Sequence, residues 1–142
     1  HWAQKDPLAE NYLRSALDIR PDGLDALYAL GMQYQQSDKL NEALETYTRI
    51  LQIDSTYRAA YYNMGYIQYQ YLQLYDEALM NFDRAVKADP EYHQAVYMRG
   101  LCYEAKGDVA RAKQEYSYAL RLNPNYKLAA DGLTRLLKKT TK

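Results

Sequence analysis

One pattern of side chains recurs along this chain at a period of 34 or 35 residues, and it constrains the fold more than any other feature. Three columns of the pattern are filled by Gly31, Gly65 and Gly100, by Ala43, Ala78 and Ala112, and by Tyr47, Phe82 and Tyr116. A period of this size is typical of stacked helical hairpins rather than of one globular core. Stacked hairpins offer a long surface and rarely a catalytic pocket.

The repeats predict one all-α repeat domain over residues 1–142, with about eight helices. Full units of two antiparallel helices are expected at residues 24–57, 58–92 and 93–126. Residues 1–23 match only the second helix of a unit. Residues 127–142 begin as another first helix and then become basic, which predicts a capping helix. Its apolar side chains would cover the last hairpin: Leu128, Leu133, Leu136 and Leu137.

The glycine column has a physical explanation. A glycine inside a helix costs roughly 1 kcal/mol in helix propensity, so three glycines at one register indicate a compensating gain. Two helices approach most closely where small side chains face each other, and we therefore expect close packing at this column. The middle unit holds one extra residue between Gly65 and Ala78. Either its first helix is longer or its turn is wider, and the sequence leaves both open.

Composition narrows the class of protein. Hydrophobic residues make up 48% of the chain and charged residues 25%, as in an ordered helical protein rather than a disordered one. No apolar run approaches about 18 residues, so we expect no membrane span. The single Cys102 has no partner for an internal disulfide, which fits a reducing, cytoplasmic compartment. The chain starts at His1 rather than Met, so an exported or lipid-anchored parent stays open.

Charge is unevenly distributed although the formal net charge is zero. The first 92 residues are acidic and the last 50 are basic. One interpretation is an ordinary solvated surface with a basic last helix, which also suits a helix C-terminus. The other is a bipolar rod that associates weakly head to tail.

The repeated residues resemble the tetratricopeptide repeat family over almost the whole chain. The best match is Ala60-Tyr61-Tyr62-Asn63-Met64-Gly65, followed by Tyr75-Asp76-Glu77-Ala78-Leu79 and Ala88-Asp89-Pro90. The chain departs from the family pattern at three places: Ser55, where the family has proline, the extra residue of the middle unit, and Arg99, where the other units have Leu30 and Met64. We expect Arg99 to bury its stem and to direct its guanidinium at a neighbouring acid. The resemblance implies a right-handed superhelical solenoid whose first helices line a concave groove that binds peptides or partner proteins.

Mapped onto this chain, the resemblance predicts a Tyr- and Met-lined peptide-binding surface. Its residues are Tyr28, Met32, Gln35, Tyr62, Asn63, Tyr66, Tyr69, Gln94, Tyr97, Met98 and Leu101. Spacings of three or four residues independently place each helix's members on one face. Tyr offers apolar area with a polar tip and Met adapts to varied shapes. The predicted function is a non-catalytic scaffold that binds a protein or peptide; the alternative is a structural spacer or a self-associating segment of a longer array.

Several ligands and chemistries are not expected. Family members that clamp a C-terminal carboxylate use Lys and Asn in one unit, Asn in the next, and Lys and Arg in the third. The matching positions here hold Tyr28 and Met32, then Asn63, then Gln94 and Met98, and only Asn63 fits. Cys102 and His93 lie nine residues apart on one predicted helix, pointing to opposite sides. Cys102 is therefore interpreted as a packing residue and His93 as a surface residue at a helix start. No phosphate-binding motif is present, and the surface is too poor in Lys and Arg for nucleic acid. We expect no enzyme, cofactor or metal site.

Overall fold

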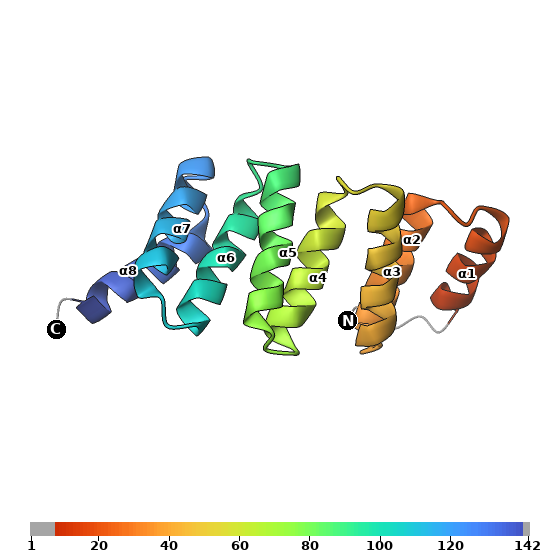
Figure 1. The fold of residues 1–142 in the computed structure, drawn as a ribbon, viewed down its shortest axis with the longest axis horizontal. Helices are drawn as coiled ribbons and strands as arrows, with labels where there is room; N and C mark the ends of the chain where they lie inside the picture. Colours follow the sequence, from red (N-terminus) through yellow and green to blue (C-terminus); the bar gives the residue numbers. More distant parts are fainter. Residues whose placement is uncertain (1–7, 141–142) are drawn as a thin grey trace. The chain divides into compact units, whose positions relative to one another are not determined.

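A computed structural model describes residues 8–140, which form eight helices and no strand (Figure 1). The helices are α1 (Ala9–Ile19), α2 (Leu24–Gln36), α3 (Leu40–Ile53), α4 (Arg58–Gln70), α5 (Tyr75–Ala88), α6 (His93–Ala105), α7 (Val109–Leu122) and α8 (Lys127–Thr140). The predicted all-α helical repeat fold is confirmed. None of the helices in the described range is long and apolar enough to cross a membrane.

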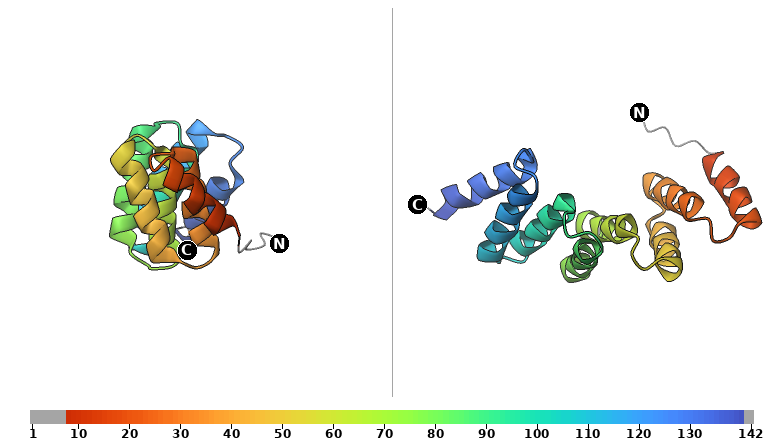
Figure 2. Two further views of the ribbon diagram at one scale, coloured as in Figure 1. Left: turned by 90° about the vertical axis from the view of Figure 1, so that its right-hand side faces the viewer. Right: turned by 90° about the horizontal axis from the view of Figure 1, so that it is seen from above.

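The chain divides into two compact units, residues 1–60 and 61–142, which we describe separately. The first unit holds α1, α2, α3 and the first turn of α4. The second holds the rest of α4 and the helices α5 to α8, which follow one another as antiparallel neighbours (Figure 2).

The glycine column brings the two helices of each hairpin together, as the sequence predicts. A Cβ atom added to Gly31 would lie 2.5 Å from Cε1 of Tyr47, and one on Gly100 would lie 2.4 Å from Cε1 of Tyr116. At Gly65 the nearest atom is Cε1 of Phe82 at 2.9 Å. All three rings are fully buried. Any larger side chain in this column would displace a core ring.

The extra residue of the middle unit lies in the turn, because α2, α4 and α6 all have 13 residues. In the first and third hairpins the amides of Lys39 and Asp108 donate to carbonyls five residues back, each at 2.9 Å. In the middle hairpin Leu74 donates to Gln68, six residues back, also at 2.9 Å. All three turns pass through a left-handed residue: Asp38 (φ 60°), Gln73 (φ 52°) and Gly107 (φ 85°). The turn of the middle hairpin therefore contains one more residue, but a backbone hydrogen bond to the first helix closes it as in the other two hairpins.

Each repeat ends in the same side-chain-capped turn. The side-chain oxygens of Asp54, Asp89 and Asn123 accept from the amide two residues further on, at 2.9, 3.1 and 3.2 Å. These Asx-turns form with or without proline at the next position, which explains why Ser55 can replace proline without loss of the turn.

Two neighbouring clusters form the core of the second unit. The first is built by α5 and α6 and includes Phe82, Ala95, Met98 and Cys102. The second joins α6, α7 and α8 through Val96, Tyr116, Ala129 and Leu136. The prediction that four leucines of α8 cover the last hairpin is therefore partly wrong. Leu136 is buried, but Leu128 is 53% and Leu137 is 49% exposed. Ala129 and Leu136 are seven residues apart and share the helix face that meets α7.

Candidate peptide-binding surface

The predicted residues fall on one helix of the first unit and two helices of the second. The α2 surface consists of Tyr28, Met32 and Gln35. The α4–α6 surface consists of Tyr62, Asn63, Tyr66, Tyr69, Gln94, Tyr97 and Leu101. All of these side chains are partly exposed. The remaining predicted residue, Met98, is only 7% exposed and belongs to the core cluster of α5 and α6, so it contributes little contact area.

Tyr28, Tyr62 and Tyr97 occupy equivalent positions in the three repeats and are called here the tyrosine ladder; a second tyrosine packs against each of them. The ring centroids of Tyr28 and Tyr57 lie 5.7 Å apart, and those of Tyr97 and Tyr126 lie 5.5 Å apart. Tyr62 stacks on Tyr92 at 5.2 Å. The second ring always comes from the linker just before the next helix pair. Each ladder residue therefore ties the first helix of its repeat to the linker that ends the repeat, and only part of each ring faces outward.

Tyr62 contacts a core ring as well as its neighbouring tyrosine. Besides stacking on Tyr92, its ring meets the edge of Phe82 at 5.7 Å. Burial raises the pKa of the Tyr62 phenol well above its ordinary value, with smaller contributions from the phenols of Tyr126, Tyr92, Tyr66 and Tyr97. Tyr62 is therefore neutral at physiological pH and packs against the core.

Gln35 has a structural partner that sequence reasoning did not identify. Its amide oxygen accepts a 2.9 Å hydrogen bond from the hydroxyl of the buried Tyr47. The equivalent bond in the third hairpin runs from Tyr116 to Glu104 at 2.7 Å. In the middle hairpin Phe82 has no hydroxyl, and the acceptor position holds Tyr69. The signal was present in the sequence, because an amide or carboxylate residue accompanies each buried Tyr of this column and is replaced by Tyr69 where Phe82 stands.

Further tyrosines extend the α4–α6 surface at the C-terminal end of α4. The rings of Tyr66 and Tyr71 stack with an interplanar angle of 14° and a centroid distance of 6.3 Å. The ring centroids of Tyr69 and Tyr75 lie 5.6 Å apart. Burial raises the pKa of the Tyr69 phenol. These contacts hold the rings in fixed orientations, and sequence reasoning missed both Tyr71 and Tyr75.

The surface becomes charged towards α8. Arg135 occupies the position in α8 that Tyr66 and Leu101 hold in α4 and α6, and its guanidinium makes a two-pronged ion pair with Glu104. Burial alone would raise the pKa of Glu104, but Arg135 and the Tyr116 hydroxyl outweigh it and hold that pKa below its ordinary value. Arg135 thus orients the carboxylate that accepts from Tyr116.

The structure also places three residues singled out in the sequence: Arg99, Cys102 and His93. The guanidinium of Arg99 lies 2.6 Å from Glu115 and 3.3 Å from Asp83, as expected. Cys102 is fully buried, and burial raises the pKa of its thiol to about 12. His93 does start α6, but the surface assignment is wrong: its ring is half-buried, 4.6 Å from the Tyr126 ring and 3.2 Å from the Asn123 amide.

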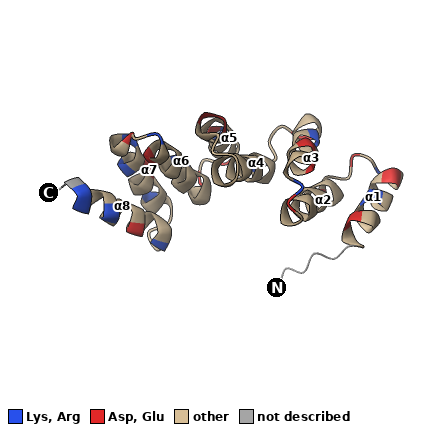
Figure 3. Cartoon of the chain, turned by 90° about the horizontal axis from the view of Figure 1, so that it is seen from below, with Lys and Arg blue, Asp and Glu red and all other residues tan. Residues whose placement is uncertain are grey.

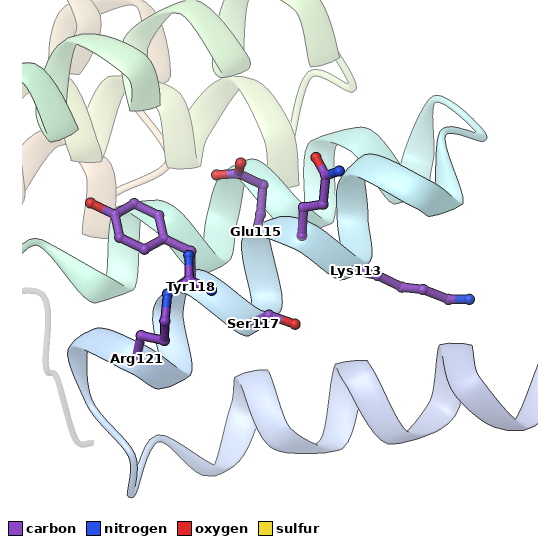
Figure 4. A pocket seen from close by; sticks show the side chains of 6 residues that line it. Lys113, Glu115, Ser117, Tyr118 and Arg121 are labelled. Carbon is purple, nitrogen blue, oxygen red and sulfur yellow. The ribbon is translucent and has the colours of Figure 1, made fainter.

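A shallow pocket lies on α7, away from the predicted residues (Figure 4). It is lined by Lys113, Gln114, Glu115, Ser117, Tyr118 and Arg121. All six side chains come from one helix, and Tyr118 donates to the carbonyl of Pro90 at 3.3 Å. Within residues 8–140, no three His, Cys, Asp or Glu side chains gather closely enough to hold a metal ion.

Comparison with known protein families identifies the family of this chain. A tetratricopeptide repeat model matches residues 67–127, and a second model of that description matches residues 24–57. Together the two matches cover more than half of the chain. The chain belongs to the tetratricopeptide repeat family. Members of this family are, in general, non-catalytic protein-interaction modules, and the chain is accordingly a protein-interaction scaffold.

Solved structures of other proteins have the same fold. MamA superimposes with a TM-score of 0.83 at 22% identity, over 93% of this chain and 77% of MamA. The first repeat domain of Spaghetti (RPAP3), bound to the HSP90 peptide SRMEEVD, gives 0.77 at 24% identity, over 84% of this chain and 94% of that one. PilF of Pseudomonas aeruginosa gives 0.83 at 30% identity, over 91% of this chain and 59% of PilF. None of the curated proteins compared matches the chain.

Proposed function

We propose that the chain binds a segment of a partner protein on its α4–α6 surface, and that it acts by binding rather than by catalysis. The observation that carries the proposal is the set of partly exposed rings at Tyr66, Tyr69 and Tyr97, which contacts with neighbouring rings already hold in place. Ordering them on binding costs little entropy, because they are ordered beforehand.

Polar side chains beside these rings suit an extended backbone. Asn63 and Gln94 each offer an amide donor and acceptor next to the aromatic area. A segment that presents apolar side chains to the tyrosines and its backbone to the amides matches this arrangement. The α2 surface, with Tyr28 and Met32, offers a second contact area of the same character.

The peptide bound to the Spaghetti domain, SRMEEVD, is acidic. The cations that would hold a terminal carboxylate are absent from the matching positions here, which are occupied by Tyr28, Met32, Asn63, Gln94 and Met98. A carboxylate without a cationic partner is held weakly. We therefore propose an apolar or aromatic segment as the ligand rather than a free acidic C-terminus.

The experiment selects ligands from a phage-displayed random peptide library and measures the selected peptides by fluorescence polarisation. Tyr66→Ala should weaken binding about tenfold or more, as loss of an aromatic anchor does. Tyr118→Ala on α7 is the matched control and should bind as the wild type does. Equal binding by a Tyr66→Ala variant of unchanged helicity, or a library that yields no binder, would contradict the proposal; the second result favours the structural spacer.

A further inference from the structure

An uncharged stretch of sequence forms most of α4 and the turn that follows it. Residues 59–75 contain no Asp, Glu, Lys, Arg or His, although a quarter of the chain is charged. Six of these 17 residues are Tyr and four are Asn or Gln. The stretch is therefore tan throughout in Figure 3, whereas Lys and Arg gather along α7 and α8. A ligand that binds here meets phenols and amides rather than charges.

Large apolar side chains of this stretch are exposed around the turn between α4 and α5. We call them the tyrosine strip, which consists of Tyr66, Tyr69, Tyr71, Leu72, Leu74 and Tyr75. Tyr71, Leu72 and Leu74 are 49%, 37% and 42% exposed, and the other three are partly exposed. Contacts between the rings and the backbone hydrogen bond from Leu74 hold the strip in place. A gathering of exposed apolar side chains marks an interaction site.

The charged groups beside the strip are paired with one another. Asp76, the first residue after the uncharged stretch, forms an ion pair with Lys106. Glu104 holds in α6 the position that Tyr69 holds in α4, and it is paired with Arg135. An acidic or basic segment would have to compete with these pairs for a partner. Complementarity of charge therefore favours an uncharged segment.

The known modes of peptide recognition narrow the conformation of that segment. Addition of a β-strand needs the edge of a sheet, and residues 8–140 contain no strand. Recognition of a phosphorylated or acidic motif needs a cluster of Arg, and residues 59–75 have none. An amphipathic helix needs a continuous apolar groove, whereas the exposed Gln70 and Gln73 interrupt the strip. The mode that remains is a polyproline II segment on an aromatic surface.

The chemistry of a proline-rich segment matches the strip. A polyproline II helix has no internal hydrogen bonds and proline has no N–H group, so its carbonyls need donors from outside. Tyrosine hydroxyls and glutamine amides are such donors, and the rings offer apolar area to the prolines. Both partners are ordered before they meet, which keeps the entropic cost of binding low.

We propose that the tyrosine strip binds a proline-rich segment of a partner protein in the left-handed polyproline II conformation. This inference rests on the proposed function, because Tyr66 and Tyr69 belong to the α4–α6 surface, and it names the kind of segment bound there. Tyr71 and Tyr75 lie outside that surface and extend it over the turn between α4 and α5.

The test compares fluorescein-labelled oligo-L-proline with oligo-D-proline of equal length, measured by fluorescence polarisation. The two peptides have the same composition and apolar area, but the D form is the mirror-image, right-handed helix. Oligo-L-proline should bind saturably, and oligo-D-proline at least about tenfold more weakly. Tyr71→Ala should weaken binding of oligo-L-proline about tenfold or more. Tyr71 is exposed, so circular dichroism should show unchanged helicity, and Tyr118→Ala on α7 is the control that should bind as the wild type does.

Three results would overturn the inference: no saturable binding of oligo-L-proline, equal affinity for both forms, or unchanged affinity in Tyr71→Ala. The random peptide library separates it from the proposed function. Selected peptides that depend on Tyr66 but are not enriched in proline would support the proposed function and overturn this inference alone. Cellohexaose is the probe for a neutral carbohydrate, and its binding at the strip in place of oligo-L-proline would also overturn it.

Discussion

The hydroxyl of Tyr116 donates a 2.7 Å hydrogen bond to Glu104, across the two helices of the third hairpin. The ring lies directly beneath Gly100, so the glycine provides the space and the carboxylate satisfies the hydroxyl. Tyr47 and Gln35 repeat this relationship at 2.9 Å in the first hairpin. A buried hydroxyl without an acceptor is costly, so the identity of the first-helix residue follows from that of the second-helix ring.

Glu104→Leu should destabilise the protein by about 1–3 kcal/mol, because it leaves the Tyr116 hydroxyl buried without its acceptor. Tyr116→Phe in that background should recover part of the loss, as the Phe82 hairpin already does without a hydroxyl. Urea unfolding of the wild type, both single variants and the double variant gives the coupling energy. Strictly additive losses would show that the bond is unimportant.

The stability of the third hairpin should fall in acid. Glu104 has a folded-state pKa below its ordinary value of 4.5, so the unfolded chain binds its proton more tightly. Its stabilising contribution is complete above the unfolded pKa and is lost as the pH falls through the folded pKa. Between about pH 7 and about pH 3, Glu104→Gln should therefore lose less unfolding free energy than the wild type. Glu45→Gln, an exposed side chain on α3, is the control and should follow the wild-type curve.

Gly65→Leu should destabilise by about 1–3 kcal/mol or more through overpacking, because a Cβ atom already falls 2.9 Å from the Phe82 ring. Combining it with Phe82→Leu should restore part of the stability by returning volume to the hairpin. Thermal unfolding followed by circular dichroism measures both effects. An unchanged melting temperature for Gly65→Leu would count against close packing at this column.

Arg99 and Glu115 form an ion pair of which both side chains are largely buried. Burial raises the pKa of Glu115 despite the opposing effect of Arg99. Arg99→Leu alone should cost about 2–3 kcal/mol, somewhat below a fully buried pair. Arg99→Leu with Glu115→Thr, which copies Leu30 and Thr46 of the first hairpin, should recover most of that loss in urea unfolding. A double variant no more stable than the single one would contradict this reading.

Gln73→Gly should stabilise the middle turn by about 1 kcal/mol, because Gln73 adopts a left-handed conformation that costs a side chain energy. The weak 3.2 Å bond from its amide to the Gln70 carbonyl is lost at an exposed site and offsets little. Gly107→Ala is the reverse experiment and should be destabilising. Both are measured by urea unfolding, and effects of the opposite sign would refute the turn geometry.

The repeat pattern alone determined the helical hairpins, their approximate limits and the close approach at the glycine column. These features follow from the period and from side-chain size, which are local properties of the sequence. The Asx-turns that end each repeat are equally local, since one side chain and an amide two residues away form them.

Tertiary structure decided which residues on the predicted face remain available to a ligand. Met98 lies on the helix face shared with Gln94 and Leu101, yet the neighbouring helix buries it. Tyr62 and Tyr97 are braced by Tyr92 and Tyr126, some 30 residues later in the chain. Helical spacing reports the direction in which a side chain points, whereas its burial depends on side chains that other helices and the linkers bring against it.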